Sequence, residues 1–148
     1  MKKRIILLLS IFTVTLLLFG CAGKGGDVSD VKIDYGKSDI YTKEDMDKAI
    51  EVIKKEFSEW DGCKLYDIRY LSDDANSKEN IKWMNQLAKG QNIKGNFTEV
   101  IAFKSDYHSP KDTEGTAWEA DTDYKDWQWW LARDGKEGDW ILLSNGYG

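Results

Sequence analysis

The chain has 148 residues, seven of them tryptophan, and a formal net charge of −5. Its length suffices for one domain with its own hydrophobic core. Its acidic balance argues against nucleic-acid binding, which needs a basic face, and against adhesion to anionic lipid head groups through charge.

The first twenty residues have the pattern of a secretory signal peptide. A basic start, MKKR, precedes the uncharged run IILLLSIFTVTLLLFG, which is shorter than the roughly 20 apolar residues of a membrane-spanning helix. The following stretch, LFGCAG, resembles the lipobox of bacterial lipoproteins, in which the signal is cut before the Cys and that Cys carries the lipid. Phe19 departs from the pattern, because a small or β-branched residue usually stands there.

This resemblance implies a lipid on Cys21 and a domain on the outer side of the cell membrane, with an uncleaved anchor or an ordinary secreted protein as alternatives. Each buried acyl methylene contributes roughly 0.8 kcal/mol, so several chains would anchor the domain almost permanently. Without the signal, whose three basic residues are lost, 18 basic residues stand against 26 acidic ones, a net charge of −8. Residues 21–38, rich in Gly, Asp, Lys and Ser, predict a flexible tether, and residues 39–148 predict a single α+β domain.

With Cys21 acylated, Cys63 has no partner for an internal disulfide. We expect it to be a packed small hydrophobe, with an intermolecular bridge or a catalytic thiol as alternatives.

The clearest element is an amphipathic helix that starts after Thr42, a good N-cap residue. Tyr41 and Met46 occupy the positions of a hydrophobic staple, and Asp61-Gly62 is a stop signal. The apolar stripe that it would lay on a sheet comprises Met46, Ala49, Ile50, Ile53, Phe57 and Trp60.

Strand and helix signals alternate along the rest of the chain. Residues 63–71 predict a strand, and Ser77 can cap a second, shorter helix that ends at Gly90. Residues 96–109 predict a strand with Phe97, Ile101, Phe103 and Tyr107 on one face. Residues 116–124 predict a further short strand, and KDWQWWLAR and DWILLSNGYG predict two strands joined by the turn DGKEG. The order predicts a two-layer α+β fold, an antiparallel curved sheet packed by one long N-terminal helix.

Five stretches together resemble a family of uncharacterised domains in lipoproteins and secreted proteins of Gram-positive bacteria. They are YTKEDMDKAIEVIKKEF, DGCKLYDIRY, EVIAFKSDYH, YKDWQWWLARDGKEGDW and the closing GYG. The family looks like part of the cystatin-like, nuclear-transport-factor-2-like superfamily, and the resemblance covers roughly residues 40–148. It implies a curved sheet that often encloses a pocket, in proteins that include isomerases, dehydratases and binding modules. Trp130 and the long hairpin turn depart from the family pattern.

Candidates for catalysis are few. His108 is the only histidine, and with Asp106 and a tyrosine it could act as general acid and base in a proton-transfer pocket of an isomerase or dehydratase. The alternative is a solvent-facing residue at the end of a strand. We expect no metal and no cofactor, because the predicted domain has one Cys and one His, and DDANSKEN lacks the spacing of a calcium loop.

The tryptophan-rich strand offers the candidates for binding. Alternation places Trp127, Trp129, Leu131 and Arg133 on one face, which we expect to be core or the wall of a pocket. Trp130 lies on the other face and is the best candidate for a binding surface, together with Tyr124, Gln128 or Arg133. A partly covered aromatic residue is the alternative for Trp130.

These observations favour a lipid-anchored extracellular domain that binds or assembles without catalysis. Its partner would be a protein, a glycan or a small molecule. A small pocket enzyme, a glycan-binding module with exposed tryptophans and a structural subunit of an envelope complex are the alternatives.

Overall fold

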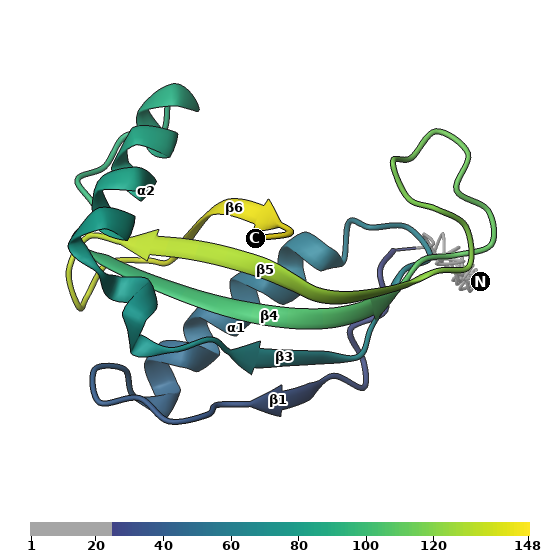
Figure 1. Cartoon of the computed structure of the whole chain (residues 1–148), viewed down its shortest axis with the longest axis horizontal. Coiled ribbons are helices and arrows are strands. Elements are labelled where there is room, and N and C mark those ends of the chain that lie inside the picture. Colours follow the sequence, from purple (N-terminus) through teal and green to yellow (C-terminus); the bar gives the residue numbers. More distant parts are fainter. Residues whose placement is uncertain (1–24) are drawn as a thin grey trace, which may run out of the picture.

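The computed structural model describes residues 25–148, so the predicted signal peptide and Cys21 lie outside the described residues. The described part is an α+β fold with a mixed sheet and two helices (Figure 1). No helix within residues 25–148 is long and apolar enough to cross a membrane. The sheet has the order β1-β3-β4-β5-β6, with β2 paired to β4. The elements are β1 (Lys32–Asp34), α1 (Lys43–Phe57), β2 (Lys64–Leu65), β3 (Asp67–Tyr70), the 3-10 turn η1 (Asp73–Asn76), α2 (Lys78–Gly90), β4 (Glu99–His108), β5 (Asp123–Arg133) and β6 (Ile141–Gly146).

Helix α1 starts where the sequence predicts. The Thr42 side chain accepts a hydrogen bond from the backbone N–H of Asp45, and the Asp45 carboxylate accepts one from the backbone N–H of Thr42. This reciprocal capping box satisfies two N–H groups that have no partner inside the helix. The helix ends at Phe57, and Trp60 lies in the turn beyond it, with its ring 5.0 Å from that of Phe57.

The expectation of a wholly antiparallel sheet is wrong, because β1 pairs with β3 in parallel, with Ile33 opposite Ile68. Parallel neighbours need a crossover connection, and α1 lies in the chain segment that joins these two strands. Strand β1 falls within residues 21–38, which we expected to be a flexible tether. The side chains of Val31, Ile33 and Tyr35 pack against the main core and hold this segment on the domain.

The predicted strand over residues 63–71 is interrupted at Tyr66, which separates β2 from β3. Cys63 and Leu65 are buried before this break, and Ile68 and Tyr70 are buried after it. The buried side therefore changes from odd to even positions, so the uninterrupted alternation that we expected is wrong. Both halves still pair with β4.

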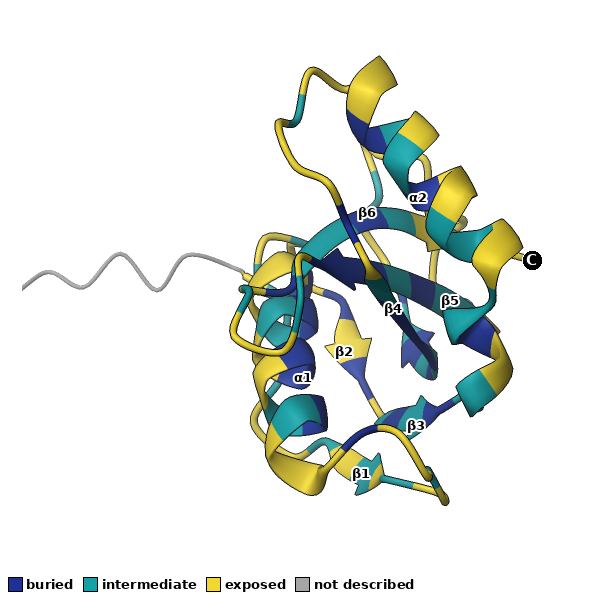
Figure 2. Ribbon diagram, turned by 90° about the vertical axis from the view of Figure 1, so that its left-hand side faces the viewer, coloured by how far each residue is buried: buried dark blue, intermediate teal, exposed yellow. Residues whose placement is uncertain are grey.

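The two helices cover opposite faces of the sheet (Figure 2). Ile101, Phe103 and Leu131 face α1 and belong to the larger core. Val100 and Ala132 face the other way and form a smaller core with α2. Phe97 belongs to the smaller core, contrary to the expectation that it shares a face with Ile101, because it precedes β4.

Residues 109–122 form a long connection between β4 and β5, so the short strand predicted for residues 116–124 is wrong except at Asp123 and Tyr124. The Ser109 side chain holds the two ends of this loop together by donating to Glu119 O and accepting from the backbone N–H of Thr122. The loop folds back over the sheet through Trp118, whose ring lies 4.8 Å from that of Trp60.

Candidate functional site

A groove of about 340 Å³ lies between α2 and the end of β6, and we call it the α2–β6 groove. Its volume is at the small end of the range of ligand pockets, about 300–1,000 Å³. The residues that line it are Trp83, Gln128, Trp130, Ser144, Asn145, Gly146, Tyr147 and Gly148. Three aromatic side chains and three neutral hydrogen-bonding side chains thus share one hollow.

No charged side chain is among these described lining residues, although 32% of the whole chain is charged. Three other hollows in the described part of the chain are each lined by several Lys, Asp or Glu side chains. Charged side chains are well hydrated and resist desolvation by a neutral ligand. Of these four hollows, the α2–β6 groove is therefore the one best suited to a neutral ligand.

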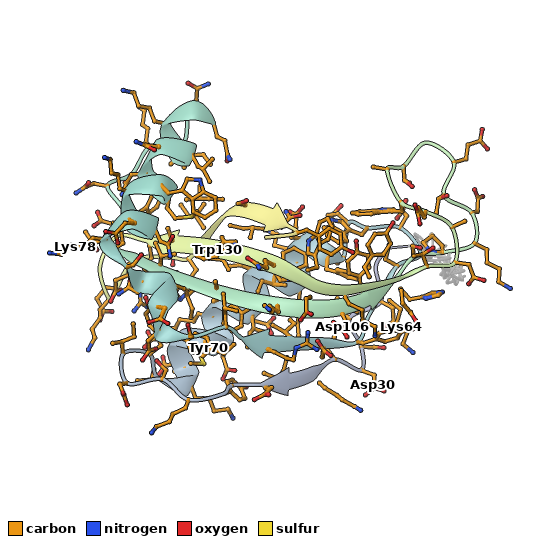
Figure 3. All side chains as sticks on the ribbon, in the orientation of Figure 1. Asp30, Lys64, Tyr70, Lys78, Asp106 and Trp130 are labelled. Atoms are coloured by element: carbon orange, nitrogen blue, oxygen red, sulfur yellow. The ribbon has the colours of Figure 1, made fainter. Side chains whose placement is uncertain are left out.

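The tertiary structure positions the aromatic rings of the groove. Trp130 projects from β5 towards α2 (Figure 3), and its ring lies 5.3 Å from that of Trp83 at an interplanar angle of 75°. Trp130 Nε1 donates to Gln128 Oε1 at 2.9 Å, which fixes both side chains. Trp83 is 37% exposed and Tyr147 is 64% exposed, so both offer apolar surface to a ligand.

The four predicted binding residues lie in different places. Trp130 and Gln128 line the groove, whereas Tyr124 and Arg133 belong to the α1 side of the sheet. Asp126 adopts a φ of +54°, and a register shift between β4 and β5 accompanies it. This bulge reverses the alternation and turns Tyr124 to the same side as Trp127. Of the three residues suggested as neighbours of Trp130, the structure therefore places Gln128 beside it, and Tyr124 and Arg133 on the other side of the sheet.

Arg133 is 1% exposed and cannot contribute to an open binding surface. Its Nη1 lies 2.8 Å from Asp45 Oδ1 and its Nε lies 2.6 Å from Glu99 Oε2. The guanidinium also lies 4.4 Å from the centre of the Trp140 ring. These contacts join the end of β5 to the first turn of α1.

The first face of the tryptophan-rich strand, with Trp127 and Trp129, belongs to the main core. Trp129 is fully buried, and Trp127 is partly buried in the same core, as expected for a face that forms core or pocket wall. A chain of ring–ring contacts joins seven side chains into one aromatic cluster: Trp60, Tyr107, Trp118, Tyr124, Trp127, Trp129 and Tyr147.

Two polar atoms of this aromatic cluster have no hydrogen-bond partner among the described residues. They are Tyr107 Oη and Trp127 Nε1, and both are buried. Trp129 Nε1, in contrast, donates to Ser105 Oγ at 3.0 Å. Burial raises the pKa of Tyr107 far above its ordinary range, so its hydroxyl stays protonated.

The structure separates the predicted catalytic residues. Asp106 lies on the sheet face opposite α1, towards the end remote from Trp130 (Figure 3). Its carboxylate accepts from Arg69, from Lys125 and from the backbone N–H of Asp126. Burial alone would raise the pKa of Asp106, but these bonds outweigh it and lower the pKa to about 2. Such a carboxylate stays ionised at neutral pH and is a poor general base.

His108 contacts two other carboxylates instead. Its Nδ1 lies 2.8 Å from Asp123 Oδ1 and its Nε2 lies 3.1 Å from Asp121 Oδ1. These two bonds raise the pKa of His108 above its ordinary value. Tyr107 lies on the opposite side of the strand, in the aromatic cluster. The predicted combination of Asp106, His108 and a tyrosine is therefore not brought together around one pocket.

Cys63 is a buried free thiol, and burial, assisted by the nearby Asp61 carboxylate, raises its pKa to about 11. A thiol with that pKa is protonated at neutral pH and weakly nucleophilic. Within residues 25–148, no group of three or more His, Cys, Asp or Glu side chains is arranged to hold a metal ion.

Sequence reasoning found Gln128 and Trp130 but missed the other residues of the groove, including its two other aromatic side chains. Trp83 fell on the polar side of the second predicted helix, where a lone tryptophan between Lys82 and Met84 was a usable signal of an exposed aromatic surface. Tyr147 follows the last strand, and its position depends on how β6 pairs with β5.

The chain matches no family model, no curated protein and no solved structure.

Proposed function

We propose that this protein is a lipid-anchored binding module outside the cytoplasm, attached through Cys21, and that its α2–β6 groove takes a neutral glycan. The observation that carries the proposal is the lining of the groove, which combines three aromatic rings with neutral amide and hydroxyl groups. The lipobox-like LFGCAG supports the anchor.

The chemistry of sugars explains the choice of ligand. A sugar ring has an apolar C–H face that packs on an aromatic ring and a rim of hydroxyl groups that need donors and acceptors. Trp83 and Tyr147 supply exposed aromatic surface, and Asn145, Ser144 and Gln128 supply both donors and acceptors. A protein partner of ordinary size would need a larger surface than this groove.

The finer fold that we propose is the cystatin-like one, a curved sheet with α1 across one face. Burial of the apolar stripe of α1 against the sheet supports this proposal, and the parallel strand β1 is an addition to it. The support for an enzyme is weaker, because Asp106 forms ion pairs with Arg69 and Lys125 on the face of the sheet away from α1.

The test is a titration of the full chain in detergent micelles with N-acetylglucosamine oligosaccharides, followed by calorimetry and tryptophan fluorescence. The expected result is saturable binding that Trp83→Ala or Tyr147→Ala weakens about three- to tenfold each, the value of one aromatic contact. Neither change should unfold the protein, because both side chains are substantially exposed.

The matched control is Tyr66→Ala, which removes an aromatic ring that is 36% exposed and does not line the groove. It should leave binding unchanged. Equal weakening by Tyr66→Ala, or no binding of any neutral oligosaccharide, would exclude the proposed function.

A further inference from the structure

Strand β6 lies at one end of the sheet order, so its second edge has no strand partner within residues 25–148. In an antiparallel pair, every second residue of such a strand directs its N–H and C=O away from its partner. Unpaired edges of this kind are templates for another extended chain unless they are covered. One group is covered, because Gln91 Nε2 donates to Leu143 O at 2.9 Å. The register of β6 against β5 shifts at Leu143, and the two residues before it, Ile141 and Leu142, have no such cover from a described side chain.

A groove runs beside the start of β6, between this strand and α1, and we call it the α1–β6 groove. It consists of a hollow of about 420 Å³ next to Trp140 and one of about 260 Å³ next to Leu142. The two hollows share Val52. Trp140, Leu142 and Val52 give the groove an apolar floor.

We propose that an extended segment of a partner protein binds in the α1–β6 groove by adding as a strand to the free edge of β6. This site lies on the opposite side of the sheet from the proposed glycan groove and does not depend on it. Main-chain hydrogen bonds to β6 would supply the affinity, and the apolar floor would receive alternate side chains of the segment.

The dimensions of the groove define the length of the segment. Its helical wall runs from Lys48 to Glu56, which corresponds to about 12 Å at a rise of 1.5 Å per residue. An extended chain covers that distance with about four residues. The proposed segment is therefore short, with an apolar side chain at every second position.

The charged side chains around the α1–β6 groove indicate the charge of the segment that it binds. Five carboxylates and three lysines line the two hollows. The carboxylates belong to Glu51, Glu56, Glu59, Glu137 and Asp139, and the lysines are Lys48, Lys55 and Lys136. Lys48 pairs with Glu44 at 3.2 Å and Glu51 pairs with Lys54 at 3.6 Å, which leaves the surplus of two carboxylates unchanged. The surplus of negative charge favours a segment whose other positions carry Lys or Arg.

The probe for the test is a fluorescent, acetylated hexapeptide of alternating lysine and valine, titrated against the full chain in detergent micelles. Its fluorescence anisotropy should rise to saturation. The same peptide with glutamate in place of lysine should bind at least tenfold more weakly. No saturable binding of the lysine peptide would overturn the proposal.

Two N-methylated versions of the lysine peptide test whether the bound segment is a strand. Each carries methyl groups on one of the two alternate sets of backbone nitrogens. Only one set can donate to β6, so one version should lose binding and the other should keep it. Equal affinity of the two versions would show that the peptide does not add as a strand and would overturn the proposal.

Substitutions locate the site. Val52→Ser removes two methyl groups from the floor and should weaken binding roughly tenfold, whereas Ile40→Ser, at an exposed aliphatic residue away from the groove, should have no effect. Tyr147→Ala, in the glycan groove, should also leave peptide binding unchanged. If sedimentation shows a dimer that Val52→Ser dissociates, the occupant is a second copy of this chain and the proposal is wrong.

Discussion

Arg133 and Asp45 form a buried ion pair, 2.8 Å from Nη1 to Oδ1, that joins the last residue of β5 to the first turn of α1. Asp45 also closes the capping box of α1 with Thr42, and its backbone carbonyl accepts from Trp140 Nε1. Asp45 thus connects the start of α1, strand β5 and the final hairpin through its carboxylate and its backbone carbonyl. Arg133 Nη2 is buried without a partner in the described residues, which adds a desolvation cost to this arrangement.

We predict that Arg133→Met destabilises the protein by about 3–5 kcal/mol, because it leaves Asp45 and Glu99 without their buried counter-charge. Urea unfolding followed by tryptophan fluorescence measures this loss. The control is Arg69→Met, which breaks a network whose arginine is 32% exposed and should cost only about 1 kcal/mol. Equal losses for the two variants would contradict the assigned role of Arg133.

We predict that the protein loses stability as the pH falls from about 4 to about 2. Burial alone would raise the pKa of Asp45, but the hydrogen bonds from Arg133 and Thr42 outweigh it and lower the pKa from 3.8 to about 2. A lowered folded pKa contributes stability that is present above pH 3.8 and is lost as the pH falls through about 2. The contribution of Asp45 is roughly 2 kcal/mol.

Urea midpoints at pH 7, 4 and 2 measure this dependence. Asp45→Asn should lower the midpoint at pH 7 and flatten its decline between pH 4 and 2. A variant that declines as steeply as the unchanged protein would show that other carboxylates, such as Asp106, dominate the acid response.

We predict that Tyr107→Phe leaves the protein as stable as before or more stable, by up to about 1 kcal/mol. The hydroxyl of Tyr107 is buried without a partner, so its removal abolishes a desolvation cost without breaking a hydrogen bond. Ser105→Ala, at another buried position on β4, is the contrasting change: it removes the acceptor of Trp129 Nε1 and should cost about 1–3 kcal/mol. Thermal unfolding of the two variants compares them, and a clear loss in Tyr107→Phe would reveal an unseen partner of the hydroxyl.

We predict that His108 titrates above 6.5, because its hydrogen bonds with Asp123 and Asp121 raise its pKa. A raised folded pKa contributes stability that is present below pH 6.5 and is lost as the pH rises through the folded pKa. As His108 is the only histidine, its ring protons give a single set of NMR titration signals. Asp123→Asn should lower the midpoint of this titration. The control Asp112→Asn, in the connection between β4 and β5, should leave it unchanged. A midpoint of 6.5 or less in the unchanged protein would refute the pairing of His108 with these carboxylates.

Local sequence signals predicted the helices well, because each has a capping residue and an apolar stripe within a few positions. Thr42 and Ser77 cap α1 and α2 as expected. The tryptophan-rich strand was also predictable, since Trp129 and Leu131 alternate with Gln128 and Trp130 over the part of β5 that has no bulge. Strand β1 was missed although Val31, Ile33 and Tyr35 alternate, because the surrounding Gly and Asp residues suggested a tether.

The sequence by itself determined that this chain has two amphipathic helices, a tryptophan-rich strand with one core face, and a start that resembles a lipoprotein signal. These features depend on neighbouring residues and are set by local periodicity and capping. Only the tertiary structure decided that the sheet is mixed, that Arg133 is buried against Asp45, and that Trp83 meets Trp130. These contacts join positions between 35 and 88 residues apart in the chain, and the break at Tyr66 and the bulge at Asp126 change which side chains face each other. Local alternation carries no information on either.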